Sequence, residues 1–170
     1  MVAIQIRLAT QADIEDLVVL EARLFAADAG VHDPLVDTTW PQRRGAADFA
    51  ALLGNEKALV LIAADASGAC GHLVGWVSES SEVRRGVVTG YLRSLYVDER
   101  ARRHGVASEL VERFVAWAED DHSAVTVSVT AYADNRAARA FYTDLGFETV
   151  SVVLTRARSV DQATPNTPRG

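Results

Sequence analysis

The sequence has little of what marks a secreted, membrane-bound or metal-binding protein. It contains one cysteine, Cys70, so no internal disulfide is possible, and no Cys/His cluster has metal-ligand spacing. No apolar run approaches the roughly 20 residues needed to span a bilayer, and no charged start precedes a short apolar segment. We therefore expect a cytoplasmic protein with no bound metal and no membrane partner. Cys70 lies between Gly68 and Gly71 in a turn-like stretch, where we expect it to pack as a small apolar residue.

A basic excess is also missing. The formal net charge of −6 argues against a nucleic-acid partner, because such proteins present a basic face. Residues 1–90 carry seven Lys and Arg against twelve Asp and Glu, whereas residues 91–170 carry ten against eleven. The acidic excess in the first half would suit a cationic or amine-bearing ligand, and a solvated acidic surface is the alternative explanation.

The composition is that of one globular domain. At 170 residues, with 49% hydrophobic and 24% charged residues, the chain is long enough to bury a core and is not disordered. The polar, proline-bearing stretch 159–170 is expected to be a disordered tail, which leaves a single domain over residues 1–158.

Apolar periodicity predicts alternating strands and helices. Thr10, followed by Asp13, is expected to cap the first helix, and residues 28–45 form a long loop without periodicity. Strands are predicted over 3–10, 58–65, 71–80, 90–97, 124–131 and 147–155, with helices after Thr10, over 46–53, from Gly105 to about 120, and from Asp134 or Asn135 to Leu145.

This order predicts a mixed α/β sheet, largely antiparallel, with helices on both faces. The strand–helix–strand unit over residues 91–131 must form a right-handed crossover. Its two strands are therefore expected to be parallel.

The string RRHGVA lies between a predicted strand and a predicted helix. The first N–H groups of a helix have no partner within it and, with the helix dipole, bind anions such as pyrophosphate. Gly105 and Ala107 allow close approach, Arg102 and Arg103 add positive charge, and Ser108 offers a hydroxyl group. The string is neither a P-loop nor a dinucleotide fingerprint, and by itself it is equally compatible with an ordinary helix start.

Two longer stretches carry a family resemblance. LRSLYVDERARRHGVASELV resembles motif A of the GCN5-related N-acetyltransferase (GNAT) superfamily, where Gln/Arg-x-x-Gly-x-Gly/Ala holds the coenzyme A pyrophosphate. NRAARAFYTDLGF (135–147) resembles motif B. Both occur in the family's order and separation, so residues 3–155 are identified as a member. The resemblance implies an α/β GNAT fold with a mixed, mostly antiparallel six- to seven-stranded sheet, a parallel splayed central pair and helices on both faces.

The resemblance also implies acetyl-CoA as co-substrate. The pantetheine arm would pair with the strand before RRHGVA, the pyrophosphate would lie on the following N–H groups, and the motif B asparagine would contact the arm. Arg139 is a weaker candidate for the phosphorylated ribose, with a solvated helix face as the alternative. The implied coenzyme-binding residues are Leu95, Tyr96, Val97, Arg102, Arg103, His104, Gly105, Val106, Ala107, Ser108, Asn135 and Arg139.

For catalysis, Tyr142 matches the tyrosine that protonates the departing thiolate in many relatives, with a core packing role as the alternative. Relatives often carry a carboxylate base where this sequence has Tyr91, which is a departure from the family pattern. Tyr91 is expected to order a water or line the acceptor site, and Glu79 or Glu82 is a candidate water-mediated base.

The acceptor is the least determined part. The loop 28–45 would form one wall of the acceptor site, where Asp28, His32, Asp33 and Trp40 would bind an amine by charge and stacking, with His32 as an alternative base. We expect direct acetyl transfer to a primary amine of a small cationic molecule. Alternatives are a protein N-terminus or lysine as acceptor, and a non-catalytic acyl-CoA-binding sensor or interaction module. A homodimer would be in keeping with the family.

Overall fold

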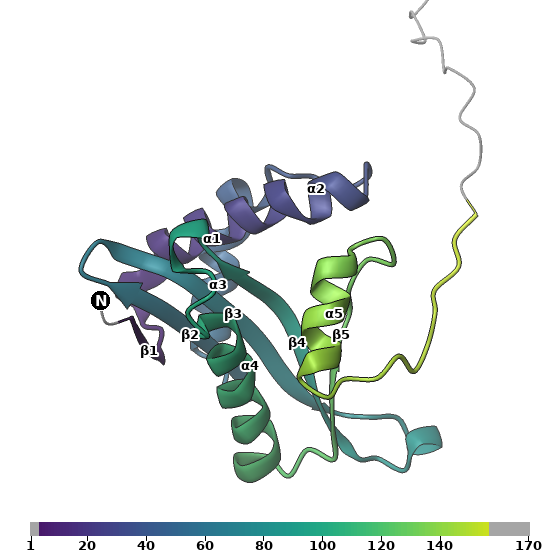
Figure 1. The fold of residues 1–170 in the computed structure, drawn as a ribbon. Helices are drawn as coiled ribbons and strands as arrows, with labels where there is room; N and C mark the ends of the chain where they lie inside the picture. Colours follow the sequence, from purple (N-terminus) through teal and green to yellow (C-terminus); the bar gives the residue numbers. More distant parts are fainter. Residues whose placement is uncertain (1–3, 157–170) are drawn as a thin grey trace, which may run out of the picture.

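A computed structural model describes residues 4–156, so the expected tail over 159–170 lies outside the described residues. These residues form one five-stranded sheet with the strand order β1-β2-β3-β4-β5 (Figure 1). The first four strands pair antiparallel, and β4 and β5 pair parallel, as predicted. The strands are β1 (Gln5–Leu8), β2 (Ala58–Asp65), β3 (Gly68–Glu79), β4 (Val88–Val97) and β5 (Thr126–Val129).

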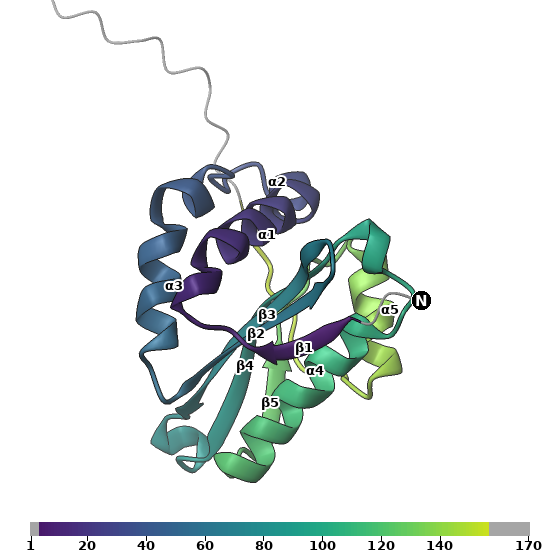
Figure 2. The same cartoon turned by 90° about the vertical axis from the view of Figure 1, so that its left-hand side faces the viewer.

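Helices cover both faces of the sheet (Figure 2). On one face lie α1 (Ile14–Ala27), α2 (Ala29–His32) and α3 (Ala46–Leu53), and Leu17 and Phe49 pack against Ile62 and Val74. On the other lie α4 (Val106–Ala116) and α5 (Arg136–Asp144), where the core includes Leu73, Leu110 and Phe114. Shorter helical turns occur at Gln11–Asp13, Pro41–Gly45, Glu82–Arg84, Glu99–Ala101 and Trp117–Asp121.

The start of the first helical segment follows the predicted pattern. The Asp13 carboxylate accepts hydrogen bonds from the Thr10 N–H (2.8 Å) and from two Arg7 nitrogens (2.7 Å each). The Arg7 hydrogen bonds outweigh the opposing effect of burial and, with Thr10, hold the pKa of Asp13 far below its ordinary value. This carboxylate therefore fixes β1 to the beginning of α1.

Three sequence predictions require correction. Residues 28–45 are not one continuous loop, since they contain α2 and the helical turn at Pro41–Gly45. The strand expected over 124–131 is shorter, and the one expected over 147–155 does not form, so the described sheet has five strands instead of six or seven. Strand propensity yields a strand only where a sheet edge supplies partners. After α5 the chain runs away from the sheet (Figure 1), and Val150 is 93% exposed.

A β-bulge in β4 at Arg93 lies next to the point where the pairing of β4 with β5 ends. Val74 is paired with Ser94 but Gly75 with Leu92, so Arg93 is the extra residue in β4. The pairing of β4 with β5 also ends at Leu92, opposite Val129. Because a bulge bends its strand, residues 93–97 continue beyond this pairing and open the parallel pair.

A buried polar cluster fixes the bulge to the helices above it. Glu21 of α1 accepts hydrogen bonds from Ser94 Oγ (2.9 Å) and His72 Nε2 (2.7 Å), and all three residues are at most 3% exposed. Arg93 donates to Asp48 of α3 at 2.7 Å. Burial alone would raise the pKa of Glu21, but the hydrogen bond and charge of His72, with Arg93 and Ser94, lower it. The bulge is therefore held to both α1 and α3 by hydrogen bonds to charged side chains.

Candidate active site

The turn before α4 presents unpaired backbone N–H groups. Arg103 and Gly105 have positive φ angles of 64° and 77°, and α4 begins at Val106. The Glu109 N–H donates to the Gly105 carbonyl (2.9 Å), so the N–H groups of residues 106–108 precede the first bond of the helix. A Cβ at position 105 would meet no atom within 4 Å, and so backbone conformation, not space, calls for glycine there.

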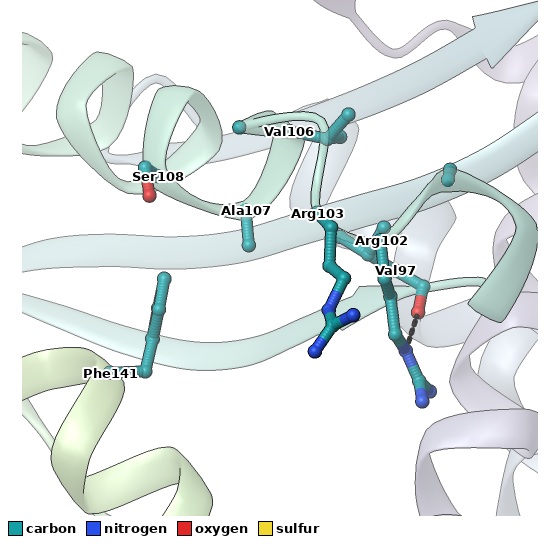
Figure 3. A pocket seen from close by; sticks show the side chains of 9 residues that line it. Val97, Arg102, Arg103, Val106, Ala107, Ser108 and Phe141 are labelled. Carbon is teal, nitrogen blue, oxygen red and sulfur yellow. Dashed lines mark hydrogen bonds between the residues drawn. The ribbon is translucent and has the colours of Figure 1, made fainter.

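These N–H groups border a cavity of about 290 Å³. Phe141 of α5 lies across it from Ala107, and Arg102 and Arg103 extend from the turn on its open side (Figure 3). Arg102 is held by a hydrogen bond from its Nε to the Val97 carbonyl (2.9 Å). Unpaired N–H groups beside two guanidinium groups suit an anion, and the residues present therefore fit a pyrophosphate. The lining is Val97, Ala101, Arg102, Arg103, Gly105, Val106, Ala107, Ser108 and Phe141.

One residue of the cavity wall, Val97, is the last residue of β4, in the part of the strand beyond its pairing with β5. Leu95, Tyr96 and Val97 lie in the part of β4 that extends beyond its pairing with β5. Leu95 packs against the core beneath α4, and burial followed by the nearby Asp98 raises the pKa of Tyr96. This strand edge is where an extended ligand arm would add to the sheet.

Asn135 and Asp28 join α5 to the end of α1. The Asn135 side-chain oxygen accepts from the Ala138 N–H (3.0 Å), which caps α5, and its Nδ2 donates to Asp28 Oδ1 (2.7 Å). Tyr142 packs edge-on against Phe141 and Phe147. Burial, followed by the negative charge of Asp28, raises the pKa of Tyr142 to about 12. The structure thus brings a predicted acceptor residue, Asp28, into contact with the predicted coenzyme residue Asn135, at the start of the helix that carries Tyr142.

His32 lies in the same group. Its Nε2 is 3.7 Å from Asp28 Oδ1, its Nδ1 is 2.8 Å from Asp134 Oδ1, and its ring stacks on Tyr132 with centroids 5.3 Å apart. Asp33 lies close enough to add to the effects of burial that raise the pKa of Tyr132. One predicted wall of the acceptor site therefore meets the loop between β5 and α5.

The other predicted acceptor and base residues make their contacts elsewhere, and none of these contacts is with Asp28, His32, Asn135 or Tyr142. Trp40 stacks on Phe25 (5.9 Å between centroids), and Tyr91 stacks on Trp76 (6.3 Å). Glu79 and Glu82 are exposed at the end of β3 and in the following turn. Glu79 pairs with Val88, four residues before Leu92, which corresponds to roughly 13 Å along the strand.

The remaining candidates have structural contacts. Arg139 donates to the Ala133 carbonyl (3.0 Å), which ties α5 to the preceding loop. Cys70 is fully buried, and burial raises its pKa, so it packs as expected for an unreactive thiol. Within residues 4–156 no three His, Cys, Asp or Glu side chains are grouped to hold a metal ion. No helix among the same residues has the length and apolar character to cross a membrane.

Sequence inspection did not single out two members of this group. Nothing in the sequence around Tyr132 indicates a functional role, and the pattern around Asp134 indicates only a helix cap, as does that of Asn135. Their contacts with His32 span about a hundred residues of sequence, so no local spacing could reveal them. Glu21, His72 and Ser94 were missed for the same reason.

A sheet that opens beside an anion-binding helix start defines a class of fold shared by N-acetyltransferases. The model of the acetyltransferase (GNAT) family matches residues 26–147, and the chain therefore belongs to this family, as its motifs predict. No curated protein matches the sequence.

Solved structures share the fold. A tetramutant of the BH1408 protein from Bacillus halodurans has a TM-score of 0.80 at 21% identity, covering 91% of this chain and 99% of that one. The aminoglycoside 6'-N-acetyltransferase AAC(6')-IG from Acinetobacter haemolyticus has a TM-score of 0.71 at 23% identity, with coverages of 92% and 99%. A predicted acetyltransferase from Clostridium acetobutylicum, solved with acetyl-CoA, has a TM-score of 0.73 at 18% identity, covering 91% of this chain and 96% of that one. At these identities the likeness establishes the fold alone.

Proposed function

We propose that this protein is an acetyl-CoA-dependent N-acetyltransferase that transfers acetyl directly to a primary amine of a small cationic molecule. The observation that carries the proposal is the cavity at the start of α4. It is bordered by the N–H groups of residues 106–108 and the two arginines, and also by Val97 at the end of β4 and Phe141 beside Tyr142 on α5. Family membership and the acetyl-CoA bound to the Clostridium acetobutylicum structure support the choice of coenzyme.

Each part of the site has a distinct task in this proposal. The N–H groups of residues 106–108, with Arg102 and Arg103, hold the pyrophosphate. Residues 95–97 hold the pantetheine arm by backbone pairing, and Asn135 orients it. The coenzyme supplies an acetyl thioester to the opening between β4 and β5.

Tyr142 is the proposed acid for the departing thiolate. Its raised pKa keeps the hydroxyl protonated at neutral pH, which a proton donor requires. The Asp28 carboxylate is the proposed anchor for the acceptor's ammonium group, since it is hydrogen-bonded to Asn135 at the start of the helix that carries Tyr142 and its charge acts on that tyrosine. The acidic first half of the chain and the aminoglycoside acetyltransferase among the similar structures support a small cationic acceptor.

The test is thiol release from acetyl-CoA with a panel of polyamines, aminoglycosides and lysine-containing peptides. We expect turnover with a small cationic amine and a fall in kcat of about 10²–10⁴-fold for Tyr142→Phe, the usual contribution of a positioned acid. The Kd for coenzyme A should stay nearly unchanged in this variant. Turnover with peptides alone would reassign the acceptor to proteins, and coenzyme binding without turnover of any amine would indicate a non-catalytic module.

A further inference from the structure

The acceptor nitrogen needs a base, and the position usual for one in this family is occupied by Tyr91. An ammonium group has no lone pair, so a proton must leave it before it attacks the thioester. Glu79 is paired about 13 Å of strand before the end of the β4–β5 pairing, which is too far for direct transfer there. A base must therefore come from another element that reaches Tyr142.

His32 has the position such a base requires. Its Nε2 lies beside Asp28, whose carboxylate accepts a hydrogen bond from Asn135 at the start of α5, the helix that carries Tyr142. The separation of 3.7 Å between Nε2 and Asp28 Oδ1 is too long for a hydrogen bond. An ammonium group anchored on the Asp28 carboxylate would lie within reach of Nε2.

The opposite side of the His32 ring faces a second carboxylate. Asp134 Oδ1 lies 2.8 Å from Nδ1 without the geometry of a hydrogen bond, and the stacking of Tyr132 restricts the tilt of the ring. The His32 side chain is only 16% exposed, whereas that of Asp134 is 72% exposed. The ring therefore lies between two carboxylates, with Nε2 toward Asp28 and the buried Nδ1 toward Asp134, whose own side chain reaches solvent.

We propose that His32 is the general base of the acetyl transfer and that Asp134 is its positioning residue. This assignment rests on the proposed function and extends it. His32 Nε2 takes one proton from the acceptor ammonium, and the nitrogen lone pair forms the C–N bond with the acetyl carbonyl carbon. The C–S bond breaks, and Tyr142 gives its proton to the thiolate. The second proton of the acceptor nitrogen returns to the Tyr142 oxygen. His32 then loses the Nε2 proton to solvent as the products leave, which restores Nε2 as the acceptor, so one proton is produced per turnover.

A role as base predicts a characteristic pH dependence. Imidazole accepts a proton only when neutral, so kcat/KM should rise with pH along an acidic limb that His32 sets. The groups that face His32 are Asp28 on α1, Asp134 and Tyr132 on the β5–α5 loop, and Asp33 beside Tyr132. Asp134→Asn should lower kcat and leave the KM for the amine nearly unchanged, because Asp134 lies against the His32 ring and does not touch the acceptor.

The experiment compares His32→Ala with the wild type over pH 5–9, using the best amine from the panel. We expect kcat to fall by about 10²–10⁴-fold, the acidic limb to disappear, and added imidazole to restore part of the activity. His122→Ala is the matched control, because this histidine lies at the far end of α4 against Trp117 and should leave the profile unchanged. Thermal unfolding and the Kd for coenzyme A should match the wild type in both variants.

Different results would overturn the role of His32 and the transferase function. A His32→Ala variant that keeps the wild-type acidic limb and rate would overturn the assignment of His32 and leave the transferase function standing. Loss of activity that imidazole does not restore, together with a lowered unfolding temperature, would also overturn it in favour of a structural role. A wild-type protein that acetylates no amine would overturn the proposed function and the base together.

Discussion

The cluster around Glu21 gives the sharpest test of how the bulge in β4 is held. In Glu21→Ala, the Ser94 hydroxyl and His72 Nε2 both lose their acceptor at sites that are at most 3% exposed, so water cannot replace it. Removing one partner of a buried charged pair costs about 3–5 kcal/mol. For a chain of this length, that corresponds to a fall of roughly 6–20 °C in the unfolding temperature, at about 2–4 °C per kcal/mol.

The assay is urea unfolding followed by circular dichroism, with Glu15→Ala as the control. Glu15 lies exposed on the same helix, and surface substitutions of this kind change stability by about 0.5 kcal/mol. Glu21→Gln separates charge from hydrogen bonding, because the amide keeps the size and one acceptor oxygen. A loss below about 1 kcal/mol in Glu21→Ala, similar to that in Glu15→Ala, would refute the view that this cluster holds β4 to α1.

Two further outcomes are expected. The pKa of Glu21 is lowered by folding, so the unfolded chain binds more protons and the stability that this group contributes is lost as pH falls below its ordinary value of 4.5. Urea unfolding of Glu21→Gln should therefore depend less on pH below that value than the wild type does; parallel curves would contradict this. Gly105→Ala and Gly86→Ala each place a side chain at positive φ in open space, which costs about 1–2 kcal/mol in either case. Only Gly105→Ala should weaken the binding of coenzyme A, measured by calorimetry. Equal affinities of the two variants for coenzyme A would contradict a pyrophosphate site at the start of α4.

Local sequence patterns were sufficient for most elements. The helix over 46–53 and the strand over 58–65 form with the predicted bounds, because each depends on apolar periodicity within one segment. Gly146 has the positive φ that is usual for a glycine directly after the end of a helix. The failure over 147–155 has the opposite cause. Alternating β-branched residues show that a segment can be a strand, but not that a neighbouring edge will receive it.

The turn at Gly105 and the motif around Asn135 were by themselves sufficient to identify the family, and they predict the coenzyme and the place of its pyrophosphate. An anion site at a helix start is formed by the N–H groups of consecutive residues, so a short stretch of sequence is enough to predict it. Only the tertiary structure decided that Asp28 meets Asn135, that His32 lies between Asp28 and Asp134, and that Glu21 supports the bulge. These contacts join residues dozens to a hundred positions apart, and the packing of α1 and α2 across the sheet brings them together.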